Sequence, residues 1–327
     1  MKFWYLFVSW QDTRIGYIVR VLIGIIFSFG LLYVAVKALD WRKVAETFLE
    51  VPLTIALLSL LPFFLNMLLR AYRWHVLMPH EKISFWETFF TQNTGIGLNN
   101  ISPVRMISEP VQLVLANRRY HVPSETALAT LVAGNVLDIF ATAVLLGMGI
   151  IIVPELRGQA SIPLFGAPIM VIVSALVVIA VARGMDNMPV ANRMVFFQRL
   201  MVAVSLLKKS PGRLVISFCA TLAHWFLLGL AAWLIADALK IDQNILTLTA
   251  LMVAATFFTS AVPSLPGAIG TYEFAVILTL SQVKVEGSSA FAFAVIMHTM
   301  VFLPAVCISL FMLYRVGFAT LLRRNSV

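Results

Sequence analysis

The chain has 327 residues, of which 61% are hydrophobic and 12% are charged, and its mean hydropathy is +0.93. A soluble domain could not cover so many apolar side chains with polar surface, so the composition excludes a water-soluble fold. The net charge of +9 does not indicate a nucleic-acid partner, because the sequence offers no soluble domain to carry a recognition surface. We therefore expect an all-α polytopic membrane protein.

Six apolar runs are long enough to span a membrane, since about 20 helical residues cross a hydrocarbon core of ~30 Å. Two further stretches, 84–117 and 245–281, carry Pro, Gly, Asn and charged residues inside otherwise hydrophobic sequence. Each half of these stretches is too short to cross on its own, so we predict two re-entrant helical hairpins. The six predicted spans are 15–36, 51–69, 124–152, 162–182, 214–236 and 288–314.

The order span, span, hairpin, span occurs twice, in a first half over 1–153 and a second half over 154–327. An odd number of spans in each half would turn the second half upside down, which is the inverted-repeat arrangement of many transporters. Both halves would form a single integral membrane domain, 1–327. A Phe-Phe-Thr triplet in each hairpin is weaker support for the repeat. We predict an interfacial amphipathic linker over 183–212, with a solvated linker as the alternative.

The distribution of basic residues predicts the orientation of the chain in the membrane. In the arrangement above, most of the 24 Lys and Arg residues, including Arg70 and Arg73, fall in segments on one side. Cytoplasmic loops carry such an excess, so we expect both termini in the cytoplasm and the protein in the cytoplasmic membrane.

The first interruption is a candidate anion site. Ser102 followed by Pro103 is typical of a helix start, where free backbone N–H groups and the positive helix end favour a phosphate. Arg105 lies two residues after Pro103, and the alternative is that it only pairs with Glu109, one turn further on, as a structural lock. The candidate substrate-binding residues of this segment are Asn99, Asn100, Ser102, Arg105 and Glu109.

Two more acids lie at predicted membrane depth, where charge is costly and suggests function. Asp138, with Asn135 on the same helix face, could neutralise Arg105 or carry a proton, or it could only hydrogen-bond to a neighbouring helix. Glu273 stands at the end of the second interruption. It could act as a titratable counter-charge, or it could only cap the helix that starts there. The residues expected to shape the hairpin tips are Pro103, Pro263, Pro266, Gly267 and Gly270.

The chain shows no motif for metal or covalent chemistry. It has no paired Cys or His at metal-ligand spacing, no nucleophile elbow and no nucleotide-binding loop. Cys219 and Cys307 are expected to be small hydrophobes, and the lone His224 and His298 to be hydrogen-bonded packing residues. We therefore expect no metal, no cofactor and no enzymatic activity.

Three blocks, 99–109, 117–138 and 263–273, resemble the membrane region of lysylphosphatidylglycerol synthetases and their flippase-like relatives. The chain has Ser108 and Gln112 where the family pattern has Gly and Arg, and Gly134-Asn135 where it has Glu-Arg. The soluble aminoacyl-transferring domain of the full synthetases is not recognisable here. The resemblance thus implies lipid translocation rather than lipid synthesis, by a stand-alone member.

The sequence predicts a translocase that moves a polar or anionic lipid between leaflets through a site between the two hairpins. The lipid would be a phospholipid, an aminoacylated lipid or a polyprenyl-phosphate-linked sugar. The alternatives are an accessory or scaffold protein that supplies lipid to a synthase or glycosyltransferase, and an integral-membrane transferase. Membrane lipids are the expected partners, with no nucleic acid; a lipid-modifying enzyme, a glycosyltransferase or a second copy of the chain is also compatible.

Overall fold

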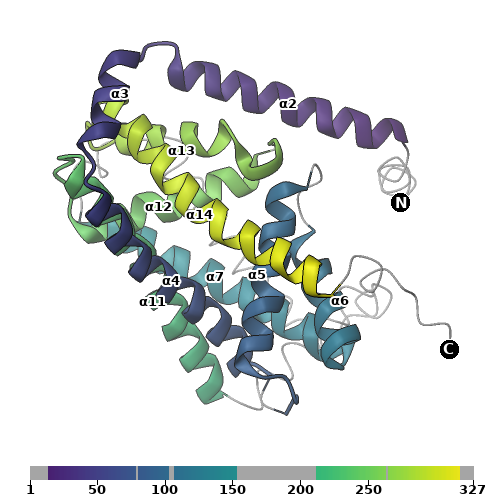
Figure 1. Cartoon of the computed structure of the whole chain (residues 1–327). Coiled ribbons are helices and arrows are strands. Elements are labelled where there is room, and N and C mark those ends of the chain that lie inside the picture. The colour runs from purple at the N-terminus through teal and green to yellow at the C-terminus, as the bar shows by residue number, and fades with distance from the viewer. Residues whose placement is uncertain (1–13, 79, 103–106, 153–210, 263, 317–327) are drawn as a thin grey trace, which may run out of the picture.

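The computed structural model describes residues 14–78, 80–102, 107–152, 211–262 and 264–316, and in these ranges the chain is helical, without strands (Figure 1). Within these ranges, ten α-helices and one short 3-10 helix follow one another. They are α2 (Arg14–Val36), α3 (Trp41–Glu50), α4 (Leu53–Val76), α5 (Phe85–Ile101), α6 (Ser108–Tyr120), α7 (Ser124–Ile152), α11 (Pro211–Ala238), α12 (Ile245–Ala261), η3 (Pro266–Ala268), α13 (Thr271–Ser281) and α14 (Gly287–Val316).

Four of the described helices, α4, α7, α11 and α14, are long and apolar enough to cross a membrane. A fifth candidate is the pair α2 and α3, which is bent by 86°. Each predicted hairpin is a broken helix pair, α5 with α6 and α12 with α13. The predicted span 162–182 and the predicted linker 183–212 lie outside the described residues.

The structure differs from the predicted elements at two places. The predicted span 51–69 ends too early, because α4 continues to Val76 and carries Arg70 and Arg73 inside the helix. The hydropathy drops at these arginines, but Arg73 is only 5% exposed since it is paired within the bundle. The second correction is α3, a short helix that was not predicted and that begins at the N-cap Asp40.

Short polar caps define where the broken helices begin. Ser84 and Glu87 form a capping box at the start of α5, and the Asn244 side chain accepts from the Thr247 N–H at the start of α12. The helices α5 and α12 are both 17 residues long. At 1.5 Å per residue each is about 25 Å long, which is less than a bilayer core of ~30 Å.

At the centre of the bundle, α4 and α11 pack against each other along most of their length and run antiparallel. The Asn66 side chain donates to the carbonyl oxygen of His224, whereas the Arg73 carbonyl oxygen, further along α4, accepts from Ser217, which lies earlier on α11. Because α5 follows the end of α4 and α12 follows the end of α11, the two broken pairs start at opposite ends of the molecule.

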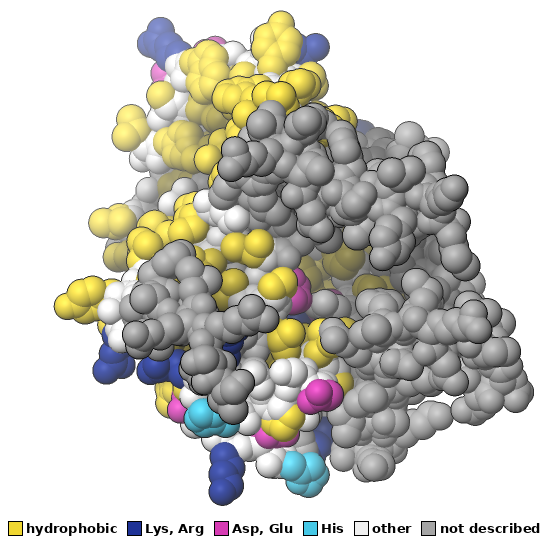
Figure 2. Space-filling model, turned by 90° about the vertical axis from the view of Figure 1, so that its right-hand side faces the viewer, with side chains coloured by type: hydrophobic (Ala, Val, Ile, Leu, Met, Phe, Trp, Pro, Cys, Tyr) yellow, Lys and Arg dark blue, Asp and Glu magenta, His cyan; other side chains and the backbone are white. Residues whose placement is uncertain are grey.

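Each broken pair packs against a long helix of the other predicted half. Helix α5 packs on α14 and α12 packs on α7, while η3 lies against α5. Gly97 of α5 lets the backbones approach closely, because a Cβ atom there would overlap the carbonyl oxygen of Ala305. On the face shown in Figure 2, hydrophobic side chains cover much of the described surface between two ends that carry charged side chains, and His side chains lie only toward the lower end.

Candidate functional site

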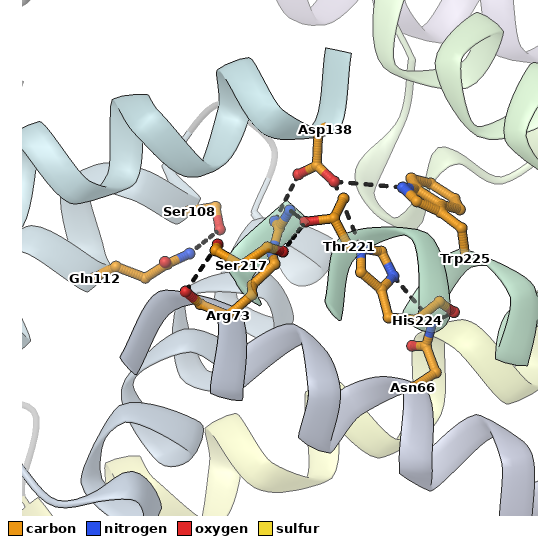
Figure 3. A network of polar contacts seen from close by, with 9 residues as sticks. All are labelled: Asn66, Arg73, Ser108, Gln112, Asp138, Ser217, Thr221, His224 and Trp225. Carbon is orange, nitrogen blue, oxygen red and sulfur yellow. Dashed lines mark hydrogen bonds and ion pairs between the residues drawn. The ribbon is translucent and has the colours of Figure 1, made fainter. Parts of the chain in front are cut away.

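A polar cluster joins α4, α7 and α11 inside the apolar bundle, and Figure 3 shows Asp138 pointing between its partners. One carboxylate oxygen of Asp138, Oδ2, accepts from Arg73 Nη2 at 2.5 Å. The other, Oδ1, accepts from the indole N–H of Trp225 at 3.3 Å and lies 3.5 Å from His224 Nε2. Each of these side chains comes from a helix that contributes to the hydrophobic core, so packing of the core positions the cluster.

The hydrogen bonds of His224 indicate which of its ring nitrogens carries the proton. Its Nδ1 atom lies 3.3 Å from the amide nitrogen of Asn66, which can only donate, so Nδ1 accepts. The proton then resides on Nε2 and faces Asp138, as expected for neutral imidazole. With His224 neutral, the positive Arg73 and the negative Asp138 cancel, and the cluster has no net charge.

Beside this cluster lies a cavity of about 240 Å³. Its polar wall includes Asn66, Arg70, Asp138 and His224, and its remaining wall is largely apolar, from α4, α5, α11, α12 and α14. The Arg70 guanidinium forms no hydrogen bond or ion pair with any described residue. Because Asp138 is already neutralised by Arg73, Arg70 gives the cavity a net positive charge.

A second polar cluster lies at the break between α12 and α13. Glu273 accepts from the Gly270 N–H at 2.6 Å through one carboxylate oxygen and contacts His298 Nδ1 at 2.5 Å through the other. His298 Nε2 lies 2.6 Å from the carbonyl oxygen of Gly267. Gly267 and Gly270 have φ angles of 69° and 82°, which an L residue rarely adopts, so both expected tip glycines shape this turn.

The predicted residues of the first break are only partly described. The side chain of Asn99 accepts from the Ile107 N–H at 3.1 Å and so bridges the gap between α5 and α6. Ser102 forms the C-cap of α5, and Asn100 is half-buried in its last turn. Pro103 and Arg105, and Pro263 of the second break, lie outside the described residues, so the anion site predicted at Arg105 stays a prediction.

The other predicted residues do not all meet at one place. Asp138 lines the cavity, whereas Glu273 belongs to the second cluster. Glu109 is exposed in the first turn of α6, and Asn135 is exposed on α7 despite sharing a helix with Asp138. Pro266 begins η3.

Sequence reasoning missed the basic side of the cavity. Arg70 and Arg73 were assigned to the cytoplasmic surface, yet both lie within α4, and Arg73 is buried. A signal was present, because Asn66, Arg70 and Arg73 are spaced by four and three residues and therefore share one helix face. Nothing local in the sequence indicated their partners on α7 and α11.

Ser108 and Gln112, the two residues at and just after the first block that differ from the family pattern, contact each other. The Gln112 side chain donates to the Ser108 hydroxyl at 2.8 Å, as Figure 3 shows. Gln112 is buried, and a Cβ atom added at Gly95 of α5 would overlap its side chain. Gln112 therefore fills the contact between α5 and α6 instead of adding charge there.

The comparison with known families decides the identity. The sequence profile of the lysylphosphatidylglycerol synthase TM region matches residues 21–309. The chain belongs to this family. The lysylphosphatidylglycerol synthase TM region is a flippase-like membrane module, so the chain is an integral membrane protein with several apolar helices. A comparison with functionally curated proteins gives no match.

The lysylphosphatidylglycerol synthase TM match covers both polar clusters and the cavity, since all their residues lie between 21 and 309. Within the described ranges, no group of three His, Cys, Asp or Glu side chains is arranged to hold a metal ion. What the site offers chemically is an unpaired guanidinium, a set of polar side chains and an apolar wall.

Proposed function

We propose that this protein is a lipid translocase that moves a polar or anionic lipid, a phospholipid or a polyprenyl-phosphate-linked lipid, between leaflets. The observation that carries the proposal is Arg70, a cation that lines the cavity and forms no hydrogen bond or close ion pair with the described residues, while Asp138 and Glu109 act on it only from a longer distance. The proposal assigns no bond-making step to the chain. It also keeps the protein in the cytoplasmic membrane with both termini in the cytoplasm, as the charge distribution predicts.

The chemistry of Arg70 favours a phosphate or a similar anion as ligand. A guanidinium presents a planar fork of N–H donors that matches two oxygens of a phosphate, and such charge-assisted bonds are strong where water is scarce. The nearby carboxylate of Asp138 does not oppose this binding, because Arg73 compensates its charge at 2.5 Å. Arg105, which the sequence predicts in the first hairpin just after Ser102-Pro103, would be a second contact.

The size of the cavity supports a head group as the bound part. Pockets that enclose a whole small-molecule ligand measure about 300–1,000 Å³. At about 240 Å³ the cavity is smaller, so acyl or prenyl chains would have to stay outside, among the apolar helices.

The arrangement of the helices supports movement between leaflets. The antiparallel pair of α4 and α11 makes the broken pair α5/α6 start at one end of the molecule and the broken pair α12/α13 at the other. The cavity lies where both pairs contribute walls, through residues such as Asn93 and Phe257. Opposed discontinuous helices around a central site are typical of alternating-access transporters.

The test is leaflet exchange of labelled anionic and zwitterionic lipids in proteoliposomes that contain the purified full chain. Removing a charged hydrogen bond in a desolvated site costs about 1.5–3 kcal/mol, so we expect Arg70→Gln to slow exchange of anionic lipids by about tenfold to a hundredfold. Arg105→Ala tests the site predicted at the first break. Arg118→Gln, an exposed arginine on α6, is the matched control and should leave exchange unchanged.

The outcomes separate the candidate functions. Exchange that is lost in Arg70→Gln and kept in Arg118→Gln would support a translocase with its site at the cavity. Equal exchange in all variants would contradict that site. Absence of exchange for every lipid would contradict the proposal and favour the accessory or scaffold role, in which a partner synthase or glycosyltransferase is needed.

A further inference from the structure

The break between α12 and α13 holds a His–Glu pair that the cavity does not use. Glu273 and His298 are 9% and 12% exposed, and their side chains are 2.5 Å apart. The Tyr272 ring lies against the His298 ring, with 4.6 Å between centroids, and Phe302 meets it edge-on at 5.9 Å. The pair is therefore enclosed by aromatic side chains and shielded from water.

Both ring nitrogens of His298 face hydrogen-bond acceptors. Nδ1 faces a carboxylate oxygen of Glu273, and Nε2 faces the carbonyl oxygen of Gly267 at 2.6 Å. Neutral imidazole has one N–H donor and one acceptor nitrogen, so beside a carboxylate it can satisfy only one of the two contacts. Both contacts need one additional proton, which forms either imidazolium or a carboxylic acid that donates to Nδ1.

The same two residues determine the shape of the chain break. His298 contacts the carbonyl oxygen of Gly267, and Glu273 accepts from the Gly270 N–H at 2.6 Å. These two glycines have the left-handed φ angles that make the turn between η3 and α13. Loss of the additional proton would set a lone pair of His298 against an acceptor, either on Glu273 or on Gly267.

We propose that Glu273 and His298 form a proton-binding site whose occupancy holds the break between α12 and α13 in the shape seen here. When the proton leaves, the contact with Gly267 or with Glu273 is lost and the turn is released. When a second proton binds, both groups are protonated, and the cap on Gly270 is weakened because a carboxylic acid is a poorer acceptor than a carboxylate.

Among the residues that the structure describes, no further charged side chain contacts the pair. Tyr272 is the described titratable side chain that touches it, and α12 contributes none.

The charged groups on the neighbouring helices lie away from the pair. Glu87 of α5 and Arg315 of α14 lie at the far end of the contact between these two helices, where Phe90 packs on Phe311. Lys43 of α3 is held at the start of α14 by Glu286, three turns before His298, and Tyr33 lies in the last turn of α2. Arg70, Arg73 and His224, on helices that also touch α14, belong to the cavity and its cluster.

The direct test is ¹⁵N NMR of the full chain in lipid bilayers with labelled histidine, where His298→Gln identifies the signal. We expect the ring ¹⁵N signals of His298 to change as pH rises and the additional proton leaves. The imidazolium form would lose one ring N–H in this transition, and the carboxylic-acid form would lose the hydrogen bond to Nδ1. Glu273→Gln removes the acid and leaves an amide oxygen to accept from Gly270, so the transition should move to lower pH. Glu125→Gln, an exposed acid at the start of α7, should leave the transition unchanged.

A second readout follows the turn itself. Ile269, 54% exposed between η3 and α13, is replaced by Cys, and its modification rate is compared at the same pH with and without His298→Gln. We expect His298→Gln to raise the modification rate several-fold at low pH. At high pH the variant should change the rate little, because the proton has already left and the turn is already released. Ring ¹⁵N signals of His298 that stay the same at every pH, or an unchanged transition in Glu273→Gln, would overturn the proposal. Neither readout requires lipid movement, so a failed translocation assay would leave this inference standing.

Discussion

At the scale of single residues, the defining feature is an ion pair inside an apolar bundle. Arg73 is 5% exposed, and its partner Asp138 lies on a different helix. Desolvating two charges is costly, and their attraction offsets that cost only where further hydrogen bonds complete the geometry. Thr221 and Trp225 provide such bonds, to Arg73 and Asp138 respectively. The pair fixes the relative positions of α4, α7 and α11.

We predict that Asp138→Asn lowers the free energy of unfolding by about 3 kcal/mol, because the buried Arg73 would lose its counter-charge. The measurement is the unfolding of the purified protein in detergent. Adding Arg73→Gln to that variant should recover part of the loss, since no uncompensated charge remains. Losses that simply add in the double variant would contradict the interpretation, and Glu125→Gln is the control for removal of an exposed acid.

Single residues of the site were predictable only where their chemistry is unusual for their surroundings. Asp138 and Glu273 stood out as acids within hydrophobic sequence, and the structure places each in a polar cluster. Their partners did not stand out, because Arg73 and His298 are far away in sequence and pairing between helices leaves no local pattern. The exposure of Asn135 shows the same limit, since a shared helix face does not determine which neighbour covers it.

At the scale of elements, hydropathy located the long helices of the described ranges and both broken pairs, because apolar length and Pro or Gly interruptions are properties of contiguous sequence. It misplaced the end of α4, where two arginines lower the hydropathy of a helix that the bundle nevertheless buries. It also missed α3, whose mixed composition is typical of an amphipathic helix rather than a span.

The contact between α5 and α14 leads to a prediction for two glycines. A Cβ atom at Gly97 would overlap the Ala305 carbonyl oxygen, whereas one at Gly147 of α7 would meet nothing within 4 Å. We expect Gly97→Ala to lower the free energy of unfolding by about 1–3 kcal/mol, because overpacking forces the helices apart. Gly147→Ala should be neutral or stabilising. Equal effects in detergent unfolding would contradict the close approach at Gly97.

At the scale of the whole molecule, corresponding helices of the two predicted halves have similar lengths. The pairs are α4 and α11 with 24 and 28 residues, α6 and α13 with 13 and 11, and α7 and α14 with 29 and 30. The Phe-Phe-Thr triplets do not contribute to this correspondence, since 89–91 lies early in α5 and 257–259 late in α12. Order and direction of helices therefore support inverted halves better than residue identity does.

The inverted arrangement predicts that the connections before the two broken pairs open to opposite sides of the membrane. Lys82, before α5, and Asp242, before α12, are both exposed. With Cys219 and Cys307 replaced by Ala, we expect Lys82→Cys to react with a membrane-impermeant thiol reagent only from the cytoplasmic side. Asp242→Cys should react only from outside, in intact cells. Labelling of both from the same side would contradict inverted halves.

Trp225 places a fluorescent side chain in the wall of the cavity. Its indole lines the cavity, donates to Asp138 and lies beside the His224 ring, 5.1 Å between centroids. Indole emission depends on the polarity and hydrogen bonding around the ring. The wall of the proposed site therefore contains its own chromophore, and the arrival of a head group would be visible in the intrinsic fluorescence of the unlabelled protein.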